Sequence, residues 1–398
     1  MAESSLLLDE PRAAVKNHLV ALTGLRILPA LAVYLYHVHA PAGSPDWLAR
    51  AFGLGYGGVT VFFVLSGFVL SINYWDALSR PSLHALRGYA AARVARIYPL
   101  YLVVILYIYL HLHVPTGRPM PGLPWHLIGL QAWLPSTLEV WAYGPPWSVS
   151  VELFLYACLP LVVFALRPLR RTRSLLIAMF ATAFGLLAMT WWFQHTGRAA
   201  LPWTNTGSDH FWLYRNPLTR IFDLVLGILG ARLYVGVRNN GRAGQLGAVL
   251  AAVAAVAFAL LLTQTWVWGT AYRWDAAWAL PGIVLIVGLA LAPRCAMSRV
   301  LAIPFIVLLG EASYAFYLIH ISVRATFGAG SWTVAFTPSR VLLELMALGM
   351  TLVLSIGLHL MIERPARVKV RGWLGGRART PVPAAETLRP ASTVVSAD

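Results

Sequence analysis

The chain has 398 residues, of which 59% are apolar and only 12% are charged, and its formal net charge is +16. Soluble domains carry about 25% charged residues, so this composition argues against a soluble protein. The positive charge does not indicate nucleic-acid binding, because it forms no basic stripe with interleaved aromatic residues. The arginines instead gather in short connections between apolar segments.

Apolar segments of the length that crosses a bilayer as a helix, about 20 residues, recur along the whole chain. The first follows a polar stretch without a small-residue cleavage site, so we expect a retained span rather than a signal peptide. The predicted fold is an all-α, polytopic membrane helix bundle of about ten transmembrane helices. We expect them at 20–39, 57–74, 97–114, 148–166, 174–193, 218–236, 245–265, 276–293, 301–322 and 341–362. The apolar piece 125–134 is too short to cross and is predicted to be interfacial or re-entrant.

The predicted organisation is an N-terminal tail at 1–19, an integral membrane domain at 20–366, and a basic and then disordered tail at 367–398. Arginine is concentrated in four alternate short connections. By the positive-inside rule these connections and both termini lie in the cytoplasm, so we expect a multi-pass protein of the cell membrane. The twelve arginines are Arg80, Arg87, Arg93, Arg96, Arg167, Arg170, Arg171, Arg173, Arg238, Arg242, Arg294 and Arg299.

The first span carries two ionisable residues, Arg26 and His37, with ten residues between them. Ionisable groups inside a membrane are costly, so both residues are functional candidates. Taken singly, each has a structural alternative: Arg26 as a side chain that snorkels to the inner headgroups, and His37 as a hydrogen-bonded histidine near the outer boundary. Eleven helical positions place the two side chains on one face about 16 Å apart. Arg26 and His37 are therefore expected to act at different depths of one cavity.

The second and third spans add polar residues at their facing ends. Ser66 and Gly67 interrupt an apolar run and are predicted to form a substrate-facing notch. Arg93 and Arg96 are neighbours on one helical face, directly before Tyr98. Since arginine forks suit phosphate oxygens, these two arginines are candidate contacts to a phosphorylated donor.

The fourth span opens with Ser148, Glu152 and Tyr156, spaced four residues apart on one face. Glu152 needs a partner inside the membrane, and Arg26 and His37 are both candidates. In the sixth span the spacing of Arg220 and Asp223 predicts an internal ion pair.

The last two spans also carry polar groups. Tyr317 and His320 lie on the ninth helix near its outer end. Glu311, on the same helix, also needs a partner inside the membrane, as Glu152 does. After Glu363, Pro365 is predicted to end the tenth span. The two cysteines of the chain predict neither a disulfide framework nor a metal site.

In order, these stretches resemble the acyltransferase 3 family of membrane O-acyltransferases, over about residues 20 to 366. The resemblance rests on Arg26 with His37 and on five motifs at plausible positions: FFVLSGFVL at 62–70, RVARIYP at 93–99, WSVSVELFLY at 147–156, GEASYAFYLIH at 310–320 and IERP at 362–365. The chain departs from the family's pattern at Thr60, where an acidic residue is usual, and at Asp223, where glutamate is common.

The resemblance implies transfer of an acyl group, acetyl or another short acyl, from cytoplasmic acyl-CoA to a hydroxyl group. It implies no tightly bound cofactor and no metal; acyl-CoA is the co-substrate. His37 is the expected general base, Arg26 the group that positions the donor or stabilises negative charge, and Glu152 their orienting partner. Arg93, Arg96 and Tyr98 are expected to bind the donor. Expected acceptor contacts are Ser66, Ser148, Tyr317 and His320.

Two acceptors fit this expectation, a cell-envelope glycan and a natural product such as a macrolide or its sugar. A multi-pass secondary transporter of an anionic or acylated solute is the alternative, because buried charges on ten spans suit it too. The two halves of the chain lack the internal repeat that many transporters show. A purely structural scaffold would leave the buried charges unexplained.

Overall fold

The computed structural model describes residues 19–40, 44–113, 122–134, 146–203, 205–328 and 338–375, and within these ranges every regular element is helical. Within the described residues, eight helices are long and apolar enough to cross a membrane. Two further spans predicted from the sequence are the shorter helices α10 and α13, of 17 and 16 residues. The predicted all-α, polytopic membrane bundle is therefore confirmed. Residues 1–18 of the predicted N-terminal tail and residues 376–398 of the predicted C-terminal tail lie outside the described residues.

The first half of the chain forms long helices joined by short ones. They are α2 (Val20–Leu25), α3 (Ile27–Val38), α4 (Asp46–Gly53), η1 (Gly55–Gly57), α5 (Gly58–Ser79), α6 (Leu83–Ile108), η2 (Tyr109–His113), α7 (Leu123–Ile128), η3 (Gln131–Trp133), α8 (Pro146–Leu166) and α9 (Thr172–His195).

The second half follows the same scheme. Its elements are η5 (Arg198–Ala200), η6 (His210–Arg215), α10 (Ile221–Val237), α11 (Ala243–Thr263), α12 (Thr265–Trp268), η7 (Ala271–Trp274), α13 (Ala276–Leu291), α14 (Ala296–Leu301), α15 (Pro304–Thr326), α16 (Pro338–Leu358), η8 (His359–Glu363) and α17 (Arg364–Gly375).

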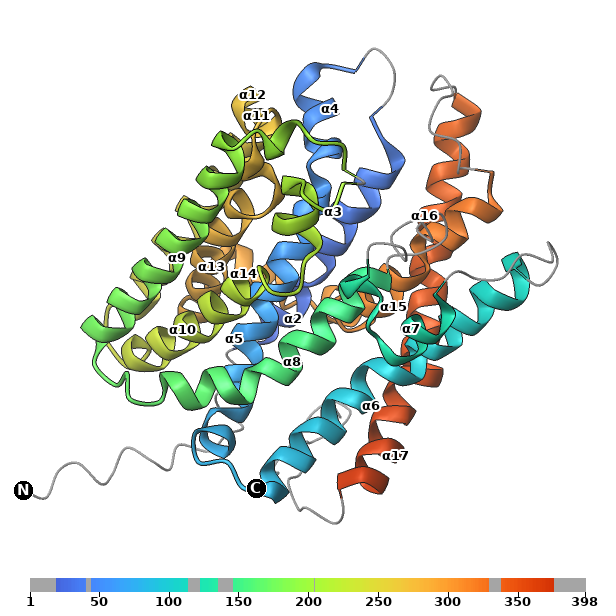
Figure 1. Ribbon diagram of the computed structural model, residues 1–398. Helices are drawn as coiled ribbons and strands as arrows, with labels where there is room; N and C mark the ends of the chain where they lie inside the picture. The colour runs from blue at the N-terminus through green and yellow to red at the C-terminus, as the bar shows by residue number, and fades with distance from the viewer. Residues whose placement is uncertain are drawn as a thin grey trace, which may run out of the picture.

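The helices form two groups with a central seam (Figure 1). Helices α9, α10, α11 and α13 gather on one side, and α6, α16 and α17 lie on the other. Helices α8 and α15 lie between the groups, and α5 packs against α10, α13 and α8. Ser66, Ser148, Glu152, Tyr317 and His320, five of the residues that the sequence singled out, are carried by α5, α8 and α15.

Glycine permits the closest of these helix contacts. A Cβ on Gly67 of α5 would lie 2.4 Å from the carbonyl oxygen of Leu224, and one on Gly227 of α10 would lie 2.2 Å from that of Val64. The two backbones therefore touch at this crossing, as small residues allow in membrane helices. The close helix contact expected of these small residues is confirmed, because Gly67 faces α10, while the substrate-facing role of Ser66 stays a prediction.

Two predicted boundaries were wrong. Helix α6 begins at Leu83 rather than near residue 97, because Ser82 caps it by accepting a hydrogen bond from the Ala85 amide at 3.1 Å. Arg93 and Arg96 lie on this helix, as their predicted common helical face requires, and Arg87 lies on it as well. Pro365 does not end the helical path, because it occupies the first turn of α17, where its missing N–H costs nothing.

The apolar piece at 125–134 forms α7 and η3, which are too short to cross a membrane, as predicted. They are fastened to α6 by two tyrosines. Tyr98 donates to the Ile128 carbonyl at 3.2 Å and Tyr101 to the His126 carbonyl at 2.8 Å.

Candidate active site

The first span is broken at the residue that the sequence marked. Pro29 cannot donate a hydrogen bond to the Leu25 carbonyl, and its ring crowds that carbonyl. The helix accordingly stops as α2 at Leu25 and restarts as α3 at Ile27, with Arg26 at the junction. The break sets the Arg26 side chain between α5 and α15, where it contacts Phe62 and Ser313.

A pocket opens at this junction, inside the helix bundle. It collects five of the ten predicted site residues: Arg26, Ser66, Ser148, Glu152 and Tyr317. They come from four parts of the fold, namely the α2–α3 junction, α5, α8 and α15. The remaining lining residues are Val59, Phe62, Phe63, Val149, Ser313 and Tyr314.

Polar contacts fix the walls of the pocket. Arg26 donates from Nε to Ser313 Oγ at 3.3 Å, and its guanidinium lies 5.8 Å from the centre of the Phe62 ring. Ser148 donates to the Tyr317 hydroxyl at 2.8 Å. These contacts join the α2–α3 junction and α8 to the same helix, α15.

Glu152 has a different partner from those proposed on sequence grounds. The hydroxyl of Tyr156, one turn further along α8, donates to Glu152 Oε1. Arg26 lines the same pocket as Glu152, but no ion pair joins the two in the described part of the chain. The shared face of Ser148, Glu152 and Tyr156 is confirmed.

His37 lies outside the pocket lining, three turns along α3 from Arg26. Its ring centre is 5.1 Å from that of His320 and 4.9 Å from that of Tyr36. His320 is buried, and its Nδ1 lies 2.7 Å from the carbonyl oxygen of Tyr317. Tyr317 thus contacts both the pocket and the histidine pair.

Arg93 and Arg96, both on α6, have different partners. Arg93 donates from Nη2 to the Tyr74 hydroxyl at 3.1 Å and lies 5.2 Å and 5.4 Å from the ring centres of Tyr74 and Tyr156. Arg96 pairs with Glu363 and lies 5.6 Å from the centre of the Tyr314 ring. Neither arginine lines the pocket. Arg96 contacts Tyr314, which lines it, and Arg93 contacts Tyr156, which donates a hydrogen bond to Glu152. Tyr98 is placed apart from them, against α7.

A charged cluster around Glu363 was not predicted. The π-helical turn η8 places His359 and Glu363 on one side, where His359 Nδ1 lies 3.2 Å from Glu363 Oε2. Arg367 lies 3.4 Å from Glu363 Oε1, and Glu311 lies 3.5 Å from His359 Nε2, which answers the question of its partner. The signal available in the sequence was the run of ionisable residues 359–367 after an apolar span.

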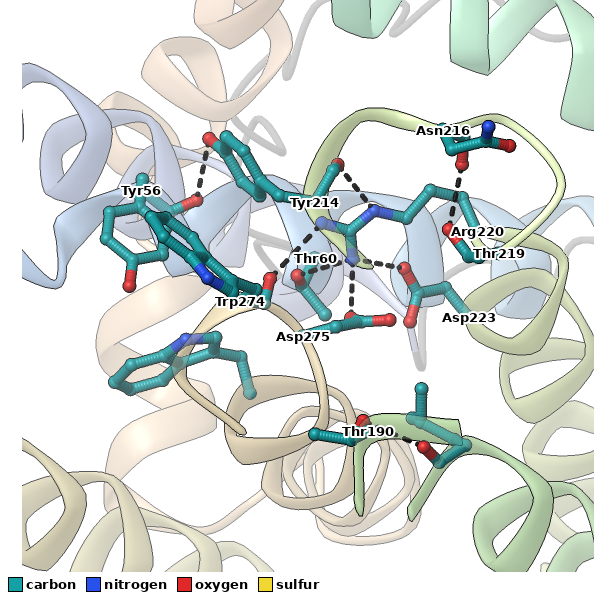
Figure 2. Close-up of polar contacts among 12 residues, drawn as sticks. Tyr56, Thr60, Thr190, Tyr214, Asn216, Thr219, Arg220, Asp223, Trp274 and Asp275 are labelled. Carbon is teal, nitrogen blue, oxygen red and sulfur yellow. Dashed lines mark hydrogen bonds and ion pairs between the residues drawn. The ribbon is translucent and has the colours of Figure 1, made fainter. Parts of the chain in front are cut away.

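The predicted pair of Arg220 and Asp223 is confirmed, with an N–O distance of 3.1 Å, and it belongs to a larger cluster (Figure 2). Asp275 lies 2.5 Å from the same guanidinium nitrogen, and Thr60 accepts a hydrogen bond at 3.0 Å. Arg220 is fully buried. Asp275 supplies the second carboxylate at the place where α5 presents Thr60 instead of an acidic residue.

Arg220 also satisfies backbone carbonyls of two irregular segments. Its Nε donates to the Tyr214 carbonyl at 2.9 Å and its Nη2 to the Trp274 carbonyl at 3.3 Å (Figure 2). Irregular backbone at membrane depth is tolerated only where protein groups replace water as partners. Arg220 therefore holds η6 and η7 against the ends of the short helices α10 and α13.

The comparisons agree with this architecture. A sequence profile described as an acyltransferase domain of the acyltransferase 3 family matches residues 19–360, so the chain belongs to this family. It is 31% identical over 373 residues to "Acyltransferase MdmB" of Streptomyces mycarofaciens, covering 87% of this chain and 91% of that protein. It is 26% identical over 299 residues to "Nodulation protein 10" of Rhizobium leguminosarum bv. viciae, covering 69% and 73%. No solved structure matches the chain.

Membership of the family makes the chain an acyltransferase of the multi-pass membrane type. The pocket at the α2–α3 junction, with the histidine pair beside it, is the candidate active site.

Proposed function

We propose that the chain transfers a short acyl group, acetyl in the first instance, from acyl-CoA to a hydroxyl of a sugar, a cell-envelope glycan or a natural product such as a macrolide. The observation that carries this proposal is the pocket that gathers Arg26 and Glu152 inside an apolar bundle, on the same broken span as His37. Buried ionisable residues of this kind are costly unless they serve function.

The chemistry assigned to the site is direct transfer. The acceptor oxygen attacks the thioester carbonyl carbon while its proton passes to His37; the C–O bond forms, the C–S bond breaks, and the proton then moves to the thiolate of CoA. General-base help of this kind contributes about 10²–10⁴-fold. Arg26 faces the negative charge that develops on the carbonyl oxygen, and Glu152 orients the groups around it.

Donor binding is assigned to α6. Arg93 rests on tyrosine faces and has no carboxylate partner in the described part of the chain, so its charge is available to a phosphate. Arg96 is already paired with Glu363. We therefore assign the first phosphate contact to Arg93, with Arg96 joining when Glu363 releases it. Tyr98, on the α7 side, would contact a more distant part of the donor.

The orientation assigned to the bundle follows from its arginines. The ends of α5, α8, α10 and α13 that precede arginine-rich connections face the cytoplasm, with both termini, as the positive-inside rule requires. The donor then enters at the end where Arg93 and Arg96 lie. Ser66, Ser148, Tyr317 and His320 are assigned to the acceptor side of the pocket.

The function is tested with membranes that contain the protein, labelled acetyl-CoA, and a panel of acceptors comprising a macrolide, its free sugar and a bacterial oligosaccharide. We expect an acyl ester, identified by mass spectrometry, on one acceptor class. Replacement of His37 by Ala should abolish the ester at unchanged protein level, since the base is lost.

The matched control is His195→Ala at the exposed end of α9, which removes a histidine far from the site and should keep full activity. Ester formation by His37→Ala at the wild-type rate would contradict the assignment. Accumulation of a labelled solute inside vesicles without any ester would instead indicate the transporter.

A further inference from the structure

One ring nitrogen of His320 makes a hydrogen bond, and the other has no hydrogen-bond partner among the described residues. A carbonyl oxygen can only accept, so the 2.7 Å contact with Tyr317 places the ring proton of His320 on Nδ1. In the neutral ring Nε2 is then an acceptor. This Nε2 is buried and has no hydrogen-bond partner among the described residues, although the whole side chain is only 1% exposed. Buried acceptors without partners are uncommon and require an explanation.

Among the described rings that contact His320, His37 is the one with a ring N–H that could be donated to Nε2. Phe316 stacks on the ring at 6.3 Å with an interplanar angle of 6°, and Tyr34, 6.2 Å away, directs its hydroxyl to Glu344. The His37 ring centre is 5.1 Å away. The structure holds no hydrogen bond between these two rings, but their separation admits one after a turn of the side chains. A linear N–H···N bond of about 2.9 Å puts two imidazole centres about 5 Å apart, because each nitrogen lies about 1.1 Å from its ring centre.

We propose that His320 is the positioning residue of His37, and that its Nε2 accepts the N–H of the His37 ring. This inference rests on the proposed function. The bond selects the tautomer of His37 in which the opposite nitrogen carries the lone pair, and that nitrogen receives the hydroxyl proton of the acceptor. When His37 becomes positively charged, the same bond stabilises it, and His320 neither gains nor loses a proton.

The position of Tyr317 connects this pair to the pocket. Its carbonyl oxygen fixes the Nδ1 proton of His320, and its hydroxyl receives the hydrogen bond from Ser148 in the pocket wall. One residue of α15 thus aligns both the histidine pair and the cavity. The two histidines are both carried by helices, His37 by α3 and His320 by α15, rather than by connections.

Two variants separate the two nitrogens of His320. In His320→Asn the side-chain amide can still donate to the Tyr317 carbonyl, but no atom remains at the place of Nε2. In His320→Gln the amide oxygen can occupy that place. The packing control is Phe316→Leu, which disturbs the other face of the ring without changing either nitrogen.

The direct test is solid-state ¹⁵N NMR of histidine-labelled protein in liposomes, with His37→Ala used to assign the signals. We expect an N–H···N correlation between the two rings in the wild type, its loss in His320→Asn, and its retention in Phe316→Leu. The absence of that correlation in the wild type overturns the proposal whether or not the protein is active.

The kinetic test uses the acceptor found for the wild type. His320→Asn should lower kcat by about 10²-fold at unchanged KM for acetyl-CoA, His320→Gln should recover most of that loss, and the double variant with His37→Ala should be no slower than His37→Ala alone. Equal losses in His320→Asn, His320→Gln and Phe316→Leu would show a packing role only and overturn the proposal. A wild-type protein that acylates no acceptor would refute the proposed function, while the NMR result would still decide on the histidine pair.

Discussion

Arg26 is the residue whose placement depends most on its own local sequence. It lies at the helix break caused by Pro29, and within the described part of the chain its guanidinium is held only by Ser313 and the Phe62 ring. A cation held so lightly can turn to a developing oxyanion. We expect Arg26→Ala to lower kcat by about 10²–10³-fold, the loss seen when one such donor is removed.

Ser313→Ala is the control for that measurement, because it removes the hydrogen bond of Arg26 but leaves its charge in the pocket. Its kcat should fall by no more than about tenfold, which corresponds to one hydrogen bond. If both variants lose the same activity, Arg26 acts through packing rather than charge.

Glu363 is the central carboxylate of the charged cluster that was not predicted from the sequence. It is 1% exposed and contacts Arg96, Arg367 and His359, so its removal leaves the largely buried Arg96 without the carboxylate that pairs with it. We expect Glu363→Ala to reduce the free energy of unfolding by about 3–5 kcal/mol. The thermal midpoint of the protein in detergent measures this loss.

Glu311→Ala removes the other carboxylate that contacts His359. Its side chain is 49% exposed, so solvent screens the interaction and the loss should be at most about 1 kcal/mol. Equal midpoints for Glu363→Ala and Glu311→Ala would show that Glu363 is not the centre of the cluster.

Among the elements, α5 contributes most to the site because it carries Phe62, Phe63 and Ser66 on one side and Gly67 on the other. A methyl group on Gly67 cannot fit against the Leu224 carbonyl, so α5 must move away from α10. We expect Gly67→Ala to cost about 1–3 kcal/mol of stability, as overpacked sites do, and to lower transfer because Ser66 moves with the helix.

The comparison variant is Gly349→Ala on α16, where nothing lies within 4 Å of the added carbon. It should leave both the thermal midpoint and the transfer rate unchanged or slightly improved. A drop of equal size in Gly349→Ala would mean that any glycine-to-alanine change harms this protein.

Most helices and half of the pocket could be predicted from the sequence, because each depends on local information. Apolar length defines a span, and four-residue spacing gave the common face of Ser148 and Glu152. The Glu363 cluster could not be predicted, because Arg96 and Glu363 are 267 positions apart and nothing local links them. The same holds for Asp275 beside Arg220, and for His320 beside His37.

Two elements were misplaced for a related reason. Hydropathy detects where a helix leaves the apolar layer, not where its hydrogen-bonded backbone ends. Helix α6 therefore continues through three arginines to its serine cap, and the path after α16 continues through η8 into α17.

At the scale of the whole molecule, the arginine distribution predicts one orientation. A fluorescent protein fused at either terminus should fold and fluoresce, because both termini are assigned to the cytoplasm, whereas alkaline phosphatase should be active only when fused after Ala200, in an arginine-poor connection. Active phosphatase at either terminus would reverse the assignment and place Arg93 away from cytoplasmic donors.

The cluster around Arg220 has a consequence for how the chain is made. Membrane helices leave the ribosome in order, so Thr60 is present before Arg220, and Asp275 arrives last, about fifty residues after the arginine. Until then the guanidinium has Asp223, Thr60 and the Tyr214 carbonyl to offset its cost in the bilayer, but lacks Asp275 and the Trp274 carbonyl. The bundle can therefore close around η6 and η7 only after α13 has entered, which makes insertion of α13 the late, committing step of assembly.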